Sequence, residues 1–243
     1  MISVSPAALA LAAAAAAGNL LGAMAVVRHH RRELTIIELG IAFGAGFMLA
    51  VAVLGVLPVV FQANPRGAVY VLAGYLAVHL AQHVVIPHFH FGEETHRVSG
   101  FTGITALFGL SLHTFFDGVA IASGFLVSGR LGLLLFLAVL VHKLPEGVTI
   151  ASIMLAGGQS KASAVWSGVW LGVATLLGVV LTEGIAPLAR HGLALSAGVT
   201  LYVAASNLVP EFQSRRGAAI ALAFFGGLGA YAVSDWLIGL WLG

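Results

Sequence analysis

The stretches His113-Thr114-Phe115-Phe116-Asp117-Gly118 and His142-Lys143-Leu144-Pro145-Glu146-Gly147 are two copies of one pattern. In each copy a histidine is followed four residues later by a carboxylate and then by a glycine. Residues four apart lie on one face of a helix, so each copy presents an imidazole and a carboxylate on the same side. Two such helices, face to face, would bring two imidazoles and two carboxylates to one point. This arrangement predicts a metal-binding site.

Both copies lie in long apolar runs, and the composition explains why. The chain has 243 residues, of which 60% are hydrophobic and 8% are charged, whereas an ordinary soluble domain carries about 25% charged residues. We therefore expect an all-α integral membrane protein, located in the inner membrane of a bacterium. Cysteine is absent, so a metal would be held by nitrogen and oxygen ligands. The expected partners are the lipid bilayer and divalent metal ions, with a homodimer as the assembly to consider; the net charge of +2 gives no reason to expect nucleic acid.

A helix that crosses a bilayer needs about 20 apolar residues. Eight runs qualify, and the joints between them are short and polar, so residues 1–243 are predicted to form a single transmembrane domain. The predicted spans are about 6–27, 35–61, 68–87, 100–126, 131–156, 163–187, 192–212 and 217–241.

The positive charges predict the orientation, because cytosolic loops are enriched in Lys and Arg. The joints after spans 1, 3, 5 and 7 carry seven such residues, and those after spans 2, 4 and 6 carry three. Both termini are therefore predicted to lie outside, and the loop His88–Arg97 in the cytosol.

A weaker repeat relates span 2 to span 7. When Pro58 is aligned with Pro210, Gly46 coincides with Gly198, and further matches follow. The two spans run in opposite directions, as do spans 4 and 5. The pattern predicts an inverted repeat of spans 1–3 and 6–8 around the central 4/5 pair, a feature typical of transporters. Chance similarity between two helices rich in Gly and Ala is the alternative.

Spans 4 and 5 hold ionisable side chains that do not belong in lipid. An ionised group at the bilayer centre costs roughly 2.5–3.5 kcal/mol even on the lenient insertion scale. One interpretation is a self-contained network of ion pairs. The other is a divalent metal bound by His113, Asp117, His142 and Glu146, with zinc the best match and iron, manganese or cadmium also compatible. Pro145 removes a backbone hydrogen bond within span 5, which either frees a carbonyl for the site or only kinks the helix.

These residues resemble the ZIP (Zrt/Irt-like) family of divalent metal transporters. Supporting matches are Gly46-Phe47-Met48-Leu49-Ala50 with Leu57-Pro58 in span 2, and Leu208-Val209-Pro210-Glu211 in span 7. The resemblance implies eight spans, both termini outside, and a primary metal site formed by the four residues above. It also suggests Met48 as a further metal contact, for which packing against lipid or core is the alternative.

Many members of this family bind a second metal beside the first, and this chain departs from them there. The positions that would supply those ligands hold Thr114, Lys143 and Thr175. The ammonium of Lys143 would fill the second site, so the chain resembles a single-metal branch of the family. Asp117, Glu146 and Lys143 together give the site a charge of −1, which a divalent ion changes to +1. A lysine that merely extends to an interface is the alternative.

Five other histidines mark a predicted cytosolic exit route, although a solvated loop and helix end explain them almost as well. They are His79, His83, His88, His90 and His96. The leading function is a carrier, not an enzyme, that moves divalent metal as its substrate towards the cytosol. A membrane-embedded zinc hydrolase, with Glu146 as general base, is the main alternative; a metal sensor is a third, but the short loops leave no room for a signalling domain.

Overall fold

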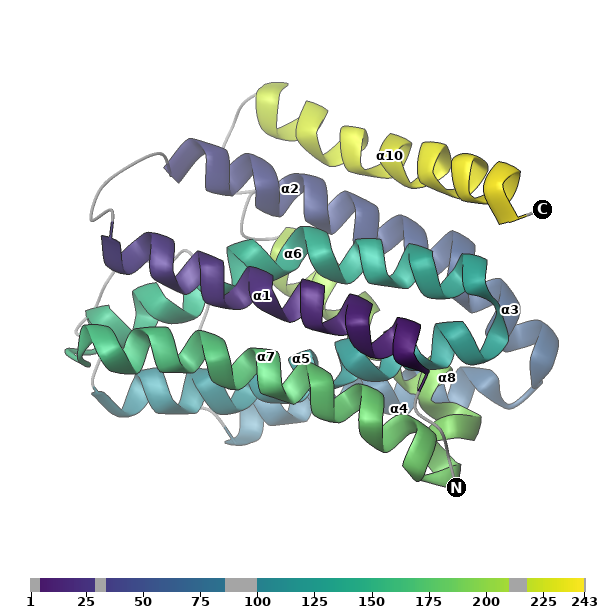
Figure 1. Cartoon of the computed structure of the whole chain (residues 1–243), viewed down its shortest axis with the longest axis horizontal. Coiled ribbons are helices and arrows are strands. Elements are labelled where there is room, and N and C mark those ends of the chain that lie inside the picture. Colours follow the sequence, from purple (N-terminus) through teal and green to yellow (C-terminus); the bar gives the residue numbers. More distant parts are fainter. Residues whose placement is uncertain (1–4, 29–33, 86–99, 210–217, 243) are drawn as a thin grey trace.

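The chain folds into a bundle of helices that run along a common long axis (Figure 1). A computed structural model describes residues 5–28, 34–85, 100–209 and 218–242, and these ranges form eight continuous helical segments. They are α1 (Pro6–Arg28); α2 (Leu34–Ala50), which continues through the π-helix η1 (Val51–Val56) into α3 (Leu57–Ala63); α4 (Gly67–Leu80) with the π-helix η2 (Ala81–Val85); α5 (Gly100–Val127); α6 (Gly129–Ala156); α7 (Lys161–Gly184); α8 (Ala186–Tyr202) with the π-helix η3 (Val203–Leu208); and α10 (Ala218–Leu242).

Six helices in the described part of the chain are long and apolar enough to cross a membrane. The other two segments, α4 with η2 and α8 with η3, carry polar side chains such as His79, Gln82 and Arg190. The all-helical membrane class predicted from composition is therefore confirmed, whereas eight crossings remain a prediction. Helix α1 begins and helix α10 ends at the same end of the bundle, as an even number of crossings requires (Figure 1).

Serine caps set the start of two helices, and a proline sets the start of another. The hydroxyl of Ser128 accepts a hydrogen bond from the Leu131 amide at 3.2 Å, and Ser160 caps α7 in the same way. The predicted boundary between the spans 163–187 and 192–212 was wrong, because α7 ends at Gly184 and α8 begins at Ala186. Proline favours the first turn of a helix, and Pro187 occupies that place in α8.

Glycines allow the helices around the central pair to touch backbone to backbone. Helix α1 packs against α6 and α7, and α5 packs against α6, α7 and α8. A Cβ atom placed at Gly118 would lie 1.9 Å from the carbonyl oxygen of Thr175, and one at Gly147 would lie 2.1 Å from that of Asn19. The glycine that follows each carboxylate therefore fixes how closely a neighbouring helix approaches.

The outer helices pair in a matched way. Helix α2 packs on α10, where a Cβ at Gly46 would lie 2.1 Å from the Phe224 carbonyl oxygen. Helix α8 packs on α4, where a Cβ at Gly198 would lie 1.9 Å from the Val71 carbonyl oxygen. Gly46 and Gly198 are the residues that the Pro58/Pro210 alignment pairs. The π-helices η1 and η3 also begin at aligned residues, Val51 and Val203.

A cluster of buried apolar side chains fills the bundle on one side of the repeated motif. It joins the first half of α6 to η1, to α8 and to Tyr231 of α10. Its members include Phe47, Met48, Val51, Val56, Leu131, Leu134, Leu135, Ala138, Val199, Tyr202 and Tyr231. Apolar packing therefore fills the half of the bundle that holds the start of α6, and a smaller apolar cluster with Leu110 and Met154 lies in the other half.

Candidate metal centre

The four residues predicted as ligands come together between α5 and α6. His113 and Asp117 lie one turn apart on α5, and His142 and Glu146 lie one turn apart on α6. One donor atom from each lies within 4.8 Å of the donors of the other three, and all four residues are buried. The four donor atoms come together because each histidine shares a helix face with the carboxylate four residues later, as the sequence predicted.

The two imidazoles face the same oxygen atom. Asp117 Oδ2 lies 3.5 Å from His113 Nε2 and 3.2 Å from His142 Nε2. His142 Nδ1 donates a hydrogen bond to the Ala138 carbonyl at 2.7 Å, which leaves its Nε2 as the metal-facing nitrogen. His113 Nδ1 has no hydrogen-bond partner among the residues that the structure describes.

These distances fit a small divalent ion. Ligand atoms around a tetrahedral zinc at roughly 2.0–2.2 Å stand about 3.4 Å apart. The two distances from histidine nitrogens to Asp117 Oδ2 are already in that range. A carboxylate oxygen of Glu146 lies within 4.8 Å of the other donors and supplies the fourth candidate ligand. The donor set of two nitrogens and two carboxylates therefore suits zinc in chemistry and in spacing.

Lys143 and Thr114 hold the two carboxylates. The ammonium Nζ of Lys143 lies 2.6 Å from Asp117 Oδ2 and 2.7 Å from Glu146 Oε2, and no part of the side chain is exposed. The hydroxyl of Thr114 donates a hydrogen bond to Glu146 Oε1. Both oxygens of Glu146 are thus engaged, and the Asp117 oxygen that faces the imidazoles also accepts from the ammonium. Lys143 points into the cluster and does not extend to an interface.

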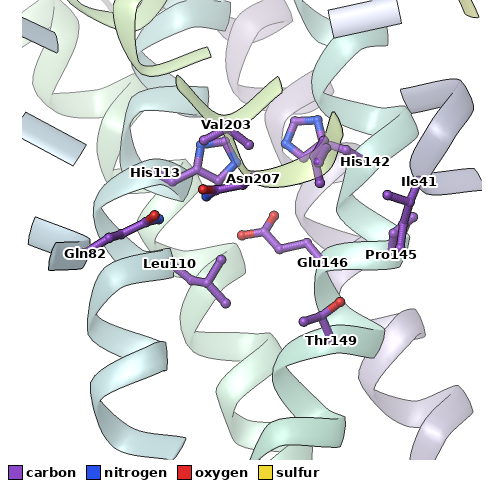
Figure 2. Close-up of a pocket in the computed structure, with 11 residues that line it drawn as sticks. Ile41, Gln82, Leu110, His113, His142, Pro145, Glu146, Thr149, Val203 and Asn207 are labelled. Atoms are coloured by element: carbon purple, nitrogen blue, oxygen red, sulfur yellow. The ribbon is translucent and has the colours of Figure 1, made fainter. Parts of the chain in front are cut away.

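A cavity of about 40 Å³ opens beside the cluster. Figure 2 shows His113, His142 and Glu146 pointing into it, with Gln82 reaching in from η2. Its other lining residues are Ile41, Leu110, Pro145, Thr149, Val203, Asn207 and Leu208. Leu110 precedes His113 on α5, and Thr149 follows Glu146 on α6. The cavity therefore lies towards the start of α5 and the end of α6, and Val203 of the apolar cluster borders it.

Two residues with predicted roles near the site lie apart from the cavity lining. Thr175 is fully buried on α7, and its hydroxyl donates to the Leu171 carbonyl at 3.3 Å. Met48 is 1% exposed and belongs to the apolar cluster that fills one half of the bundle. A metal contact by Met48 remains a prediction, and core packing is what the structure places there.

Two of the five predicted exit histidines lie in the described residues. The rings of His79 and His83 stack with their centroids 4.4 Å apart, and His83 Nδ1 lies 3.3 Å from the Tyr202 hydroxyl. Neither histidine lines the cavity, but Gln82 between them does. His88, His90 and His96 lie outside the described residues, and their role remains a prediction.

Sequence reasoning missed three polar residues near the centre. Gln82 and Asn207 line the cavity from η2 and η3, and Asn19 is fully buried on α1. Each is a single amide in an apolar run, and that signal was available in the sequence. None of them belongs to a repeated motif, and only the packing of the helices shows what each of them faces.

Comparisons with known proteins agree with this geometry. No curated protein matches the chain. A model of the ZIP zinc transporter family matches residues 92–235, which is more than half of the 243 residues and includes both copies of the motif. The chain therefore belongs to the ZIP zinc transporter family.

Proposed function

We propose that the protein carries a divalent metal ion across the membrane, with zinc as the leading substrate and iron, manganese or cadmium as alternatives. Its family and its six long apolar helices make it an integral membrane protein. The observation that carries the proposal is the buried cluster of His113, Asp117, His142 and Glu146, whose donor atoms lie within 4.8 Å of one another. Buried ionisable groups in membrane helices mark ion pathways.

We propose further that metal moves towards the cytosol. The cavity lies on the side of the cluster where α5 begins and α6 ends. The charge distribution predicts that this end faces the cytosol. The apolar cluster around Leu134 and Tyr231 fills the opposite side. The arrangement supports a state from which a bound ion leaves on the cytosolic side.

Alternating access is supported by the proposed inverted repeat. The aligned residues Gly46 and Gly198 each let a helix of the other repeat approach closely, and the aligned residues Val51 and Val203 each start a π-helix. This matched packing and the two matched π-helices support the repeat, although the third π-helix, η2, has no counterpart in α10. Such repeats place the substrate site near the bilayer midplane in transporters.

We propose that the site holds one metal ion. Lys143 contacts Asp117 and Glu146 at 2.6 and 2.7 Å, so a positive charge already stands beside the cluster. Thr175 on α7 directs its hydroxyl to its own helix. A second divalent ion would meet an ammonium and too few ligands there. The membrane hydrolase considered above has no support from the family, whose members are transporters.

Metal uptake into proteoliposomes tests the proposal, with zinc, iron, manganese and cadmium compared in one assay. Asp117→Ala and His142→Ala should each nearly abolish uptake, because each removes a ligand. His191→Ala is the matched control, since this histidine stacks on Tyr70 of α4 and lies outside the cluster. Wild-type uptake by either ligand variant would refute the site.

A further inference from the structure

Asn19 is a buried amide with nothing to bind. It lies in the middle of α1, and none of its surface is exposed. Neither its amide nitrogen nor its amide oxygen has a hydrogen-bond partner among the residues that the structure describes. Burying a polar group without a partner is unfavourable, and such groups call for an explanation. The rest of the buried face of α1 is built from alanine and glycine, so packing alone does not need an amide there.

The position of Asn19 relates it to Lys143. The backbone oxygen of Asn19 touches the helix surface at Gly147 on α6 and at Gly168 on α7. A Cβ atom placed on the preceding residue, Gly18, would lie 3.0 Å from Lys143 Cβ. The segment Gly18–Asn19 therefore rests on the turn of α6 that runs from Lys143 to Gly147. Asn19 thus lies beside Lys143 on the helix that packs directly against this part of α6.

Metal binding creates a problem for the ammonium of Lys143. In the structure it bonds to Asp117 Oδ2 and Glu146 Oε2, which are carboxylates of the proposed metal site. A divalent ion between the two imidazoles and Asp117 Oδ2 would stand next to the ammonium and repel it. The ammonium would then keep only the carboxylate lone pairs that the metal leaves free, and a buried charge with too few partners is strongly unfavourable.

We propose that Asn19 receives the ammonium of Lys143 when a metal ion takes the two carboxylates. The amide oxygen of Asn19 is a free acceptor on the helix next to Lys143. The four-carbon stem of lysine is flexible, and its three donors can turn to a new acceptor. Lys143 thus has two positions, on the carboxylates in the metal-free protein and on Asn19 in the metal-bound protein. Asn19 is a positioning residue, and this role rests on the proposed function.

Two nearby hydroxyl groups are the competing acceptors. Thr114 donates to Glu146 and Thr175 donates to the Leu171 carbonyl, so each hydroxyl has used its hydrogen but keeps lone pairs that can accept from an ammonium. Thr175 is also the counterpart of Asn19 in the proposed repeat. The carbonyl oxygen of Thr175 faces Gly118 on α5, just as that of Asn19 faces Gly147 on α6. Thr175→Val is therefore a matched control: it removes a buried polar group at the equivalent place, but one that already has its own partner.

Zinc affinity measured by competition with a chelator on purified protein tests the proposal through a double-mutant cycle. All variants lack His88, His90 and His96, so that zinc bound by the loop does not contribute. Asn19→Leu should weaken zinc binding about tenfold to a hundredfold, the effect of losing a hydrogen bond to a charged group. In a Lys143→Met chain there is no ammonium to relocate, so the same change should alter affinity less than about threefold. Lys143→Gln serves as a second background if the Met variant does not fold.

Thermal unfolding without metal separates this role from a structural one. Asn19→Leu removes an unpartnered buried amide, so the midpoint of unfolding should stay the same or rise while zinc affinity falls. Thr175→Val should change zinc affinity by the same factor in the chain with native Lys143 and in the chain that carries Lys143→Met. An equal loss of affinity in both Lys143 backgrounds, or no loss with native Lys143, would overturn the role of Asn19. Failure of Asp117→Ala to reduce zinc binding would instead overturn the metal site itself.

Discussion

Replacing Gly118 by alanine should disturb both the stability of the bundle and its metal site. The new Cβ would lie 1.9 Å from the Thr175 carbonyl oxygen, whereas ordinary contact begins at 3.4 Å, so the helices are 1.5 Å too close. Both atoms belong to the backbone or are fixed to it, and no side chain can move aside. Overpacking of this kind destabilises by about 1–3 kcal/mol.

The same change should weaken zinc binding, because Asp117 is the adjacent residue on α5. A binding site tolerates displacements of about 0.5 Å, and separating α5 from α7 exceeds that. Thermal unfolding in detergent and a zinc titration measure the two effects. Gly229→Ala is the control, since a Cβ at that position in α10 meets nothing within 4 Å; it should be neutral or stabilise by up to about 1 kcal/mol. If Gly118→Ala matches this control in both measurements, the close contact of α5 and α7 does not set the site.

Three further outcomes are expected. Lys143→Glu adds a ligand and removes the ammonium, so bound zinc should rise from one towards two per chain. The control Lys161→Glu changes an exposed lysine and should leave the stoichiometry at one. A stoichiometry of one in both variants would contradict the proposal that Lys143 blocks a second site. Single cysteines in the Ser128–Arg130 joint should react with an impermeant thiol reagent in whole cells, and labelling within residues 88–97 instead would invert the predicted orientation. Arg130→Gln breaks an ion pair with Asp235 at 2.6 Å, in which Arg130 is 48% exposed and Asp235 31%. The free energy of unfolding should therefore fall by less than about 1 kcal/mol, and the difference should become smaller at high salt concentration.

The cluster could be predicted from the sequence because its geometry depends on local spacing. A histidine and a carboxylate four residues apart share a helix face in any helix, and the repetition of the motif identified the two helices. The structure brings His113, Asp117, His142 and Glu146 together. The glycines after the carboxylates bring backbones close, but their partners on α1 and α7 follow only from the structure.

Other features could not be predicted because they depend on which helices meet. Asn19 and Gln82 are single amides in apolar runs. Only the structure shows that Asn19 lies against α6 and that Gln82 lines the cavity. The boundary between α7 and α8 was placed too late because hydropathy is continuous through Gly184, while Pro187 starts the next helix. Hydropathy measures transfer to lipid and does not report where the backbone turns.

The donor atoms that face the cavity have a consequence for dehydration. A hydrated divalent ion that binds His113 and His142 exchanges part of its water shell for imidazole nitrogens. Magnesium releases water reluctantly and prefers six oxygen ligands, whereas zinc accepts four ligands and binds imidazole well. The two nitrogen donors thus disfavour magnesium at the step where water is exchanged for protein ligands.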